Sequence, residues 1–110
     1  FAAGFHIKGE QHGSLSVEQA LFRVLQEALA NVGRHSEAKN VTLSLIWGTD
    51  AVTLTVADDG CGFDCAAAQG RGMGLQNMRE RVDALGGTFR VESSQGKGTL
   101  ITARVPLHTA

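Results

Sequence analysis

Three glycines at alternate positions open the stretch 70–87 and could help to bind a phosphate. Gly70, Gly72 and Gly74 lead into a segment whose apolar residues recur at three- and four-residue steps, which predicts a helix with one buried face. Free backbone N–H groups and the positive end of the helix dipole would point at the same place, which suits an anion. The spacing matches neither the dinucleotide-binding fingerprint nor the P-loop, and a flexible turn before a helix would have the same composition.

A second group of polar residues lies along one side of a predicted helix. Glu27, Asn31 and His35 are four residues apart, and Arg34 is close to Asn31 on the same helix. Carboxylate and amide oxygens suit Mg²⁺, and a guanidinium suits phosphate. These side chains therefore form either one wall of a site for a hard cation and phosphates or the solvated edge of a helix.

An acidic residue, Asp58, ends a predicted strand and is followed by Gly60 and Gly62. A carboxylate accepts hydrogen bonds and does not donate them, so it suits an exocyclic amino group such as that of adenine. The glycines would let the backbone approach a flat ligand closely because they carry no Cβ. An ordinary Asp-Gly turn remains the alternative interpretation.

The elements that must position these residues follow from the hydrophobic pattern. Ser16 and Gln19 form a capping-box pattern at a helix start, and Gly86 and Gly87 supply a C-terminal stop. Mostly antiparallel strands and two long helices predict an α+β sandwich with both helices on one face of the sheet. The predicted elements are an edge strand over 5–10, a helix over 16–34, strands over 41–47 and 52–56, a helix over 75–85, and strands over 88–94 and 100–105.

The composition fits one small domain. The 110 residues carry a formal net charge of −1 with both signs interspersed, so neither a nucleic-acid partner nor direct membrane contact is expected. No apolar run approaches the roughly 18 residues that a membrane span needs, and there is no signal peptide. Cys61 and Cys65 are interpreted as reduced thiols of a cytosolic protein. Because the chain starts at Phe1, we expect it to be an excerpt of a longer protein.

Four motifs in order resemble those of the catalytic ATP-binding domain of bacterial sensor histidine kinases, a branch of the GHKL ATPase superfamily. The resemblance covers 16–106. The forms of 26–35 and 72–81 are typical of the subclass whose kinases pair with helix-turn-helix response regulators of the nitrate-response type. The motifs are an asparagine box over 26–35 and three glycine boxes over 58–63, 72–87 and 96–99.

The resemblance implies a two-layer α/β sandwich of the GHKL (Bergerat) type, with a mixed, mostly antiparallel sheet and residues 1–110 as one domain. It implies an ATP-dependent protein histidine kinase that binds Mg-ATP and donates the γ-phosphoryl group to a histidine on a separate dimerisation domain, for relay to a response regulator. The full-length protein would be a cytoplasmic or membrane-anchored homodimer, and the isolated domain a monomer. None of the four histidines is followed by an acidic residue, so no autophosphorylation is expected without the acceptor domain.

The resemblance also implies residue roles. Asp58 would bind the adenine amino group, Asn31 would ligate Mg²⁺, and Glu27 would polarise the attacking group or order the water on the metal. Phosphoryl transfer asks mainly for positioning and charge neutralisation, so few reactive side chains are expected. The catalytic candidates are Glu27 and Asn31, the metal candidate is Asn31, and the nucleotide-binding candidates are Asn31, Arg34, His35, Asp58, Gly60, Gly62, Gly72, Gly74, Leu75 and Thr99.

Two other functions stay open. A serine kinase that binds a sigma factor or its antagonist would share the fold, but the segment 75–85 has the form of the sensor-kinase subclass. A non-catalytic nucleotide-sensing module would be expected to lack Asn31 or Asp58, and the chain has both.

Overall fold

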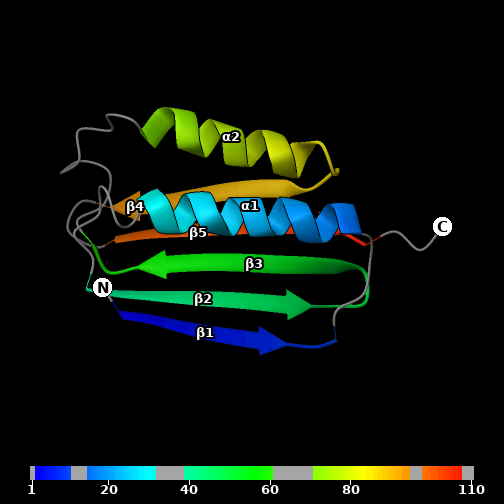
Figure 1. Cartoon of the computed structure of the whole chain (residues 1–110), viewed down its shortest axis with the longest axis horizontal. Helices are drawn as coiled ribbons and strands as arrows, with labels where there is room; N and C mark the ends of the chain where they lie inside the picture. The colour runs from blue at the N-terminus through cyan, green and yellow to red at the C-terminus, as the bar shows by residue number, and fades with distance from the viewer. Residues whose placement is uncertain (1, 11–14, 32–38, 61–70, 95–97, 108–110) are drawn as a thin grey trace.

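A computed structural model describes residues 2–10, 15–31, 39–60, 71–94 and 98–107, which form a five-stranded sheet with two helices on one face (Figure 1). The strand order is β1-β2-β3-β5-β4, with β1 parallel to β2 and the other pairs antiparallel. The predicted α+β sandwich with a mixed sheet is confirmed. The elements are β1 (Ala2–Lys8), α1 (Leu15–Asn31), β2 (Asn40–Trp47), β3 (Ala51–Asp58), α2 (Arg71–Asp83), β4 (Thr88–Ser94) and β5 (Gly98–Pro106).

The alternating apolar residues form the side of the sheet that faces the helices. Cross-strand pairing places Val91, Ile101, Val56 and Leu43 in one row across β4, β5, β3 and β2. These residues belong to the core or pack against it, and full burial of each such side chain contributes about 1.5–3 kcal/mol. The residues between them point to the opposite face, which is more polar and carries, among others, Thr53, Thr55, Thr88, Arg90, Thr102 and Arg104.

Helix α1 buries the predicted apolar stripe, with Leu21, Val24 and Ala28 in the core. It begins at Leu15, so Ser16 lies inside the first turn and the predicted N-terminal cap at Ser16 is wrong. A serine three residues before a glutamine does not by itself fix the first helical residue. The predicted continuation to 34 lies outside the described residues.

Helix α2 packs on the sheet through Met78 and Val82, which are each 1% exposed. The guanidinium of Arg79 lies 5.3 Å from the centroid of the Phe89 ring and donates a hydrogen bond to the Phe89 carbonyl oxygen at 3.4 Å. This cation–π contact ties α2 to β4. Of the two described helices, neither is long and apolar enough to cross a membrane.

The chain leaves α2 through the predicted glycine stop. Gly86 has a φ of +74°, and its N–H donates to the Asp83 carbonyl oxygen at 2.9 Å. The N–H of Gly87 donates to the Val82 carbonyl oxygen at 3.0 Å. These two bonds form the Schellman pattern, which satisfies carbonyl groups that the helix end would leave unpaired.

Strand β1 is the predicted edge strand, but it spans Ala2–Lys8 instead of 5–10. It stops before Gly9, whose φ of +86° is incompatible with an extended strand. A Cβ on Gly9 would also collide with the Trp47 carbonyl oxygen, so the backbone passes closely at the end of β2. This turn could not be foreseen from the local alternation of residues.

Candidate functional site

One end of the sandwich gathers the motifs that the sequence singles out. The C-terminal end of α1, the N-terminal end of α2, the ends of β3 and β4 and the start of β5 all lie at the left of Figure 1. Asn31 is the last residue of α1, Asp58 is the last of β3, and Thr99 follows the first residue of β5. The candidates Arg34, His35 and Gly62 and the thiols Cys61 and Cys65 lie outside the described residues.

A row of polar side chains crosses this end of the sheet. Thr99 pairs with Asp58 on β3 and with Ser93 on β4, so the three side chains share the side that faces the helices. Thr99 is 6% exposed and is the one buried polar residue in the described part of the chain. A hollow of about 280 Å³ borders these strand ends and is lined by Ala57, Asp58, Glu92, Ser93, Gly98, Thr99 and Leu100.

The hydroxyl groups of this row have a defined direction of donation. Ser93 Oγ donates to the Gly98 carbonyl oxygen at 3.2 Å, and it lies 3.1 Å from Thr99 Oγ1. Because a hydroxyl has a single hydrogen, Thr99 must be the donor in its bond to Ser93. Thr99 therefore offers lone pairs to any further partner.

The Asp58 carboxylate is held by its own turn. Oδ1 accepts the N–H of Gly60 at 2.8 Å, and Gly60 is buried. Within the described residues Oδ2 accepts no hydrogen bond, so it is the oxygen available to a ligand N–H. A Cβ on Gly98 would collide with the Asp58 carbonyl oxygen, so the start of β5 comes this close to Asp58 only because residue 98 is glycine.

The neighbouring carboxylate, Asp59, has a different task. Its Oδ1 accepts the backbone N–H groups of Lys39 at 2.8 Å and Asn40 at 2.9 Å, and its Oδ2 accepts Asn40 Nδ2 at 2.9 Å. The Asp59 N–H donates to the Asn40 carbonyl oxygen at 3.2 Å. Asp59 thus fastens the start of β2 to the end of β3, directly beside Asp58. The sequence pattern alone does not indicate which of the two adjacent aspartates links the strands and which keeps an oxygen free for a ligand.

The hydrogen bonds on Asp59 predict a pH dependence of folding. The backbone N–H and then the side chain of Asn40 hold the pKa of Asp59 below its ordinary value. The stabilisation is therefore fully present above the unfolded-state pKa of about 3.9 and is lost as the pH falls through the lowered folded-state pKa. We expect urea unfolding of the wild type to show a loss of stability between pH 5 and pH 3, and we expect Asp59→Asn to make that loss smaller. Asp50→Asn, at an exposed turn, should leave that loss unchanged.

The glycines of the second glycine box are not in a loop. Helix α2 begins at Arg71, so Gly72, Gly74 and Leu75 lie inside its first turns and the predicted helix start at Leu75 is corrected. The first four N–H groups of a helix have no partner within the helix, so the N–H groups at Gly72 and Gly74 remain available to an anion. Anion binding by this segment stays a prediction, and the structure places Gly72 and Gly74 inside a helix and not in a flexible loop.

Glu27 and Asn31 lie one turn apart near the C-terminal end of α1, and Glu27 is half-buried. Among the described residues, no group of three or more His, Cys, Asp or Glu side chains could hold a metal ion. Mg²⁺ commonly binds through few protein oxygens together with substrate phosphates and water. The expected role of Asn31, the last residue of α1, as a Mg²⁺ ligand stays a prediction.

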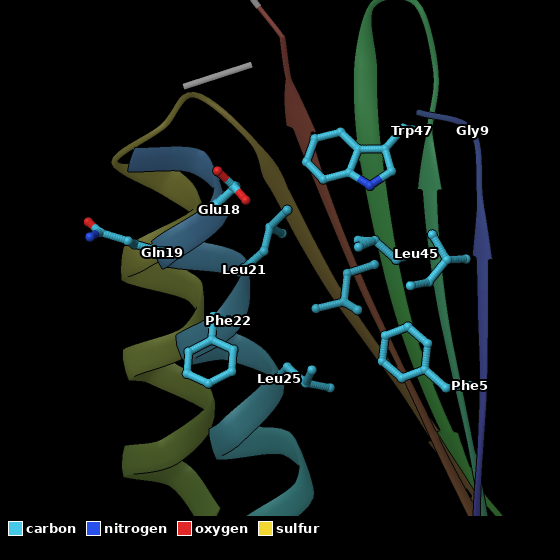
Figure 2. A pocket seen from close by; sticks show the side chains of 11 residues that line it. Phe5, Gly9, Glu18, Gln19, Leu21, Phe22, Leu25, Leu45 and Trp47 are labelled. Carbon is cyan, nitrogen blue, oxygen red and sulfur yellow. The ribbon is translucent and has the colours of Figure 1, made fainter. Parts of the chain in front are cut away.

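A mainly apolar hollow lies elsewhere in the described part of the chain. It measures about 480 Å³ and lies between α1 and the strands β1 and β2, with Leu21 and Leu25 facing Leu45 and Trp47 (Figure 2). Its walls are mainly apolar, and none of the residues predicted to bind the nucleotide lines it. Phosphates would find no cation there among the lining residues.

Comparison with known proteins places the chain among ATPase domains. A profile of the family described as histidine kinase-, DNA gyrase B- and HSP90-like ATPase matches residues 16–109. The chain is 44% identical over 94 residues to the sensor histidine kinase LiaS of Bacillus subtilis, covering 86% of this chain and 26% of LiaS. It is 43% identical over 93 residues to the histidine-protein kinase/phosphatase DegS of Bacillus subtilis, covering 82% of this chain and 24% of DegS. The chain thus spans about a quarter of the length of these relatives.

Solved structures share the fold. The histidine kinase AdeS of Acinetobacter baumannii superposes with a TM-score of 0.75 at 18% identity, covering 98% of this chain and 55% of that one. The histidine kinase domain of a blue-light activated kinase of Erythrobacter litoralis superposes with a TM-score of 0.70 at 22% identity, covering 96% of this chain and 55% of that one.

Proposed function

Because the chain belongs to the family of histidine kinase-, DNA gyrase B- and HSP90-like ATPases, we propose that it binds Mg-ATP beside Asp58 and donates the γ-phosphoryl group to a histidine on a separate dimerisation domain. The observation that carries this proposal is the Asp58 carboxylate. Gly60 holds one of its oxygens, and the other is available at the end of a largely apolar sheet face. A flat adenine ring with an exocyclic amino group suits this combination of apolar surface and acceptor.

The remaining site residues are proposed to bind Mg²⁺ and the rest of the nucleotide. Asn31 would coordinate Mg²⁺ through its amide oxygen, and Glu27 would orient the attacking group or a water on the metal. Bound Mg²⁺ would neutralise charge on the phosphate chain. Thr99 would complete the base pocket with its lone pairs, directly or through water. The other proposed nucleotide contacts come from Arg34, His35, Gly60, Gly62, Gly72, Gly74 and Leu75.

Two partners are proposed, a dimerisation domain and a response regulator, and each is named only by its class of protein. We infer that 1–110 is the catalytic domain of a cytoplasmic or membrane-anchored sensor kinase that acts as a homodimer through its dimerisation domain. The phosphoryl group would pass to a response regulator of the nitrate-response type, as the forms of 26–35 and 72–81 suggest. LiaS, named as a sensor histidine kinase, and DegS, named as a signal transduction histidine-protein kinase/phosphatase, support a two-component role.

Titration calorimetry of ATP into the chain, with and without Mg²⁺, tests the first half of the proposal. Binding that strengthens with Mg²⁺ is expected, and no binding at millimolar ATP would contradict it. The second half is tested by adding a separately purified dimerisation domain and γ-labelled ATP. Label on a histidine of that domain, stable to base and labile to acid, is the expected product. ATP binding with no transfer to any cognate dimerisation domain would favour a nucleotide-sensing module instead.

A substitution at the end of α1 should separate nucleotide binding from metal binding. We expect Asn31→Ala to abolish the gain in ATP affinity that Mg²⁺ gives, while ATP still binds without metal, because the substitution removes the carboxamide proposed to hold the metal and leaves the base pocket intact. The circular dichroism spectrum should stay native. Asn77→Ala on the exposed side of α2 is the matched control and should keep the full Mg²⁺ effect. An unchanged Mg²⁺ effect in Asn31→Ala would rule out Asn31 as the metal ligand.

A further inference from the structure

A short chain of hydroxyl groups links β4 to β5 beside the Asp58 carboxylate. Ser93 Oγ donates to the Gly98 carbonyl oxygen at 3.2 Å, and Thr99 Oγ1 lies 3.1 Å from the same Ser93 oxygen. A carbonyl oxygen can only accept, so the one hydroxyl hydrogen of Ser93 is committed to Gly98. The hydroxyl hydrogen of Thr99 is therefore committed to Ser93. The backbone carbonyl group at the end of the chain thus sets the direction of both hydrogen bonds.

The sheet fixes the position of the two hydroxyl groups. Ser93 and Thr99 are direct partners in the register of β4 and β5. The Cβ atoms of such partners lie about 4.5–5.5 Å apart, which lets two short hydroxyl side chains form a hydrogen bond. Thr99 is buried and Ser93 is half-buried, so water competes little for their hydrogens. The strand pairing therefore holds the Thr99 hydroxyl in one orientation.

This orientation leaves the neighbouring hollow without a side-chain donor. Of the described residues that line it, only Ser93 and Thr99 carry side chains that can donate when the carboxylates are ionised, and both hydrogens are already used. Asp58 pairs with Thr99 across β3 and β5, and Asp58 Oδ1 accepts the Gly60 N–H. Asp58 Oδ2 and Thr99 Oγ1 are therefore neighbouring acceptors at the sheet end. A ligand group that meets both oxygens must itself be a donor.

Purine bases differ in this property. Adenine carries an amino group at position 6, whose two hydrogens could go to Asp58 and Thr99. Hypoxanthine carries a keto oxygen at position 6 and a hydrogen on N1. The N1 hydrogen could still reach the carboxylate, but the keto oxygen would face the lone pairs of Thr99 with no hydrogen between them. A polar group left unpaired or opposed in this way is an effective source of specificity.

We propose that Ser93 is a positioning residue that fixes the Thr99 hydroxyl as an acceptor and thereby makes the site prefer a 6-amino to a 6-keto purine nucleotide. The inference rests on the proposed function and deepens it, because it assigns base selectivity to a residue that need not touch the base. Without the Ser93 hydroxyl, Thr99 would be free to turn and donate to a keto oxygen. Asp58 binds the amino group, and Ser93 acts by keeping Thr99 from accommodating its replacement.

Calorimetric titration of ATP and of inosine triphosphate into the same variants tests the proposal. We expect Ser93→Ala to lower the ratio of ATP affinity to inosine triphosphate affinity about 3- to 10-fold, the range for one neutral hydrogen bond, mainly through tighter binding of inosine triphosphate. A general loss of affinity cancels in this ratio. The matched control is Ser44→Ala on β2, where Ser44 lies on the side of the sheet that faces away from the helices. It should keep the wild-type ratio.

Two further variants show whether the effect passes through Thr99. Ser93→Thr keeps a hydroxyl group at this position and should keep the ratio close to that of the wild type. In a Thr99→Val background, Ser93→Ala should no longer change the ratio, because no hydroxyl group remains for Ser93 to orient. A direct contact between Ser93 and the base would instead change the ratio equally in both backgrounds.

The outcomes separate this inference from the proposed function. An unchanged ratio in Ser93→Ala, or an equal change with and without the Thr99 hydroxyl, would overturn the role of Ser93. If the wild type nevertheless binds ATP and Asp58→Asn weakens that binding, the proposed function stands without it. If the wild type binds neither nucleotide, the proposed function fails and the inference fails with it.

Discussion

Replacing Asp58 by asparagine is expected to weaken ATP binding about 10- to 150-fold, the range for loss of a hydrogen bond to a charged group. One oxygen of the wild-type carboxylate accepts the Gly60 N–H at 2.8 Å, and in the proposed complex the other accepts from the ligand. An asparagine amide has a single acceptor oxygen. Either its oxygen stays on Gly60 and its NH₂ group faces the adenine amino group, or it turns and leaves the Gly60 N–H without a partner. Neither orientation replaces the carboxylate.

Two comparisons isolate the effect. Asp50→Asn, at the opposite end of the sheet, should bind ATP like the wild type. A purine riboside triphosphate that lacks the 6-amino group should bind wild type and Asp58→Asn with similar affinity, because the lost contact is the one to that group. If ATP binds Asp58→Asn as tightly as the wild type while the circular dichroism spectrum stays native, Asp58 is not the base-binding residue. All affinities are measured by calorimetry at one Mg²⁺ concentration.

Local patterns predicted most of the fold because helix α1 and strands β2 to β5 have a clear periodicity. The alternation in β2 to β5 follows from one side packing on helices and the other meeting solvent. The structure keeps that division along most of these strands, although the adjacent Ala51 and Val52 of β3 are both buried. The stop at Gly86 was predictable because a left-handed φ at a helix end favours glycine for steric reasons. The candidate site was predictable only as separate motifs. Their gathering at one sheet end depends on the direction of each strand and helix.

The parts that escaped prediction depend on contacts between distant segments. Ser93 forms a hydrogen bond with Thr99 because the register of β4 and β5 places the two residues side by side. No pattern within β4 predicts this pairing. Asp59 fastens β2 to β3 through Lys39 and Asn40, which are separated from it by a whole hairpin. The early end of β1 at Gly9 has the same origin, since Trp47 passes against it.

The second large prediction concerns three glycines. They differ in whether an alanine there would be strained by a left-handed φ, would place its Cβ against a neighbouring atom, or both. Gly98→Ala should cost about 3 kcal/mol or more of unfolding free energy, from a left-handed φ of +89° and a Cβ forced into the Asp58 carbonyl oxygen. Gly86→Ala, with a φ of +74° and its nearest neighbour the Pro106 Cγ at 3.9 Å, should cost about 1 kcal/mol. Gly4→Ala, with nothing within 4 Å, should change stability by less than about 0.5 kcal/mol. Urea unfolding of the three variants measures these differences.

The same series links stability to the site. The new Cβ in Gly98→Ala would collide with the backbone of Asp58. To remove this collision, either the start of β5 or Asp58, whose carboxylate is proposed to bind adenine, must move. Gly98→Ala should therefore lose ATP affinity at temperatures where it is fully folded, whereas Gly86→Ala should lose stability alone. If Gly98→Ala binds ATP normally while folded, the start of β5 shifts without moving Asp58. The close packing at Gly98 is then needed for the stability of the sheet and not for binding of the base.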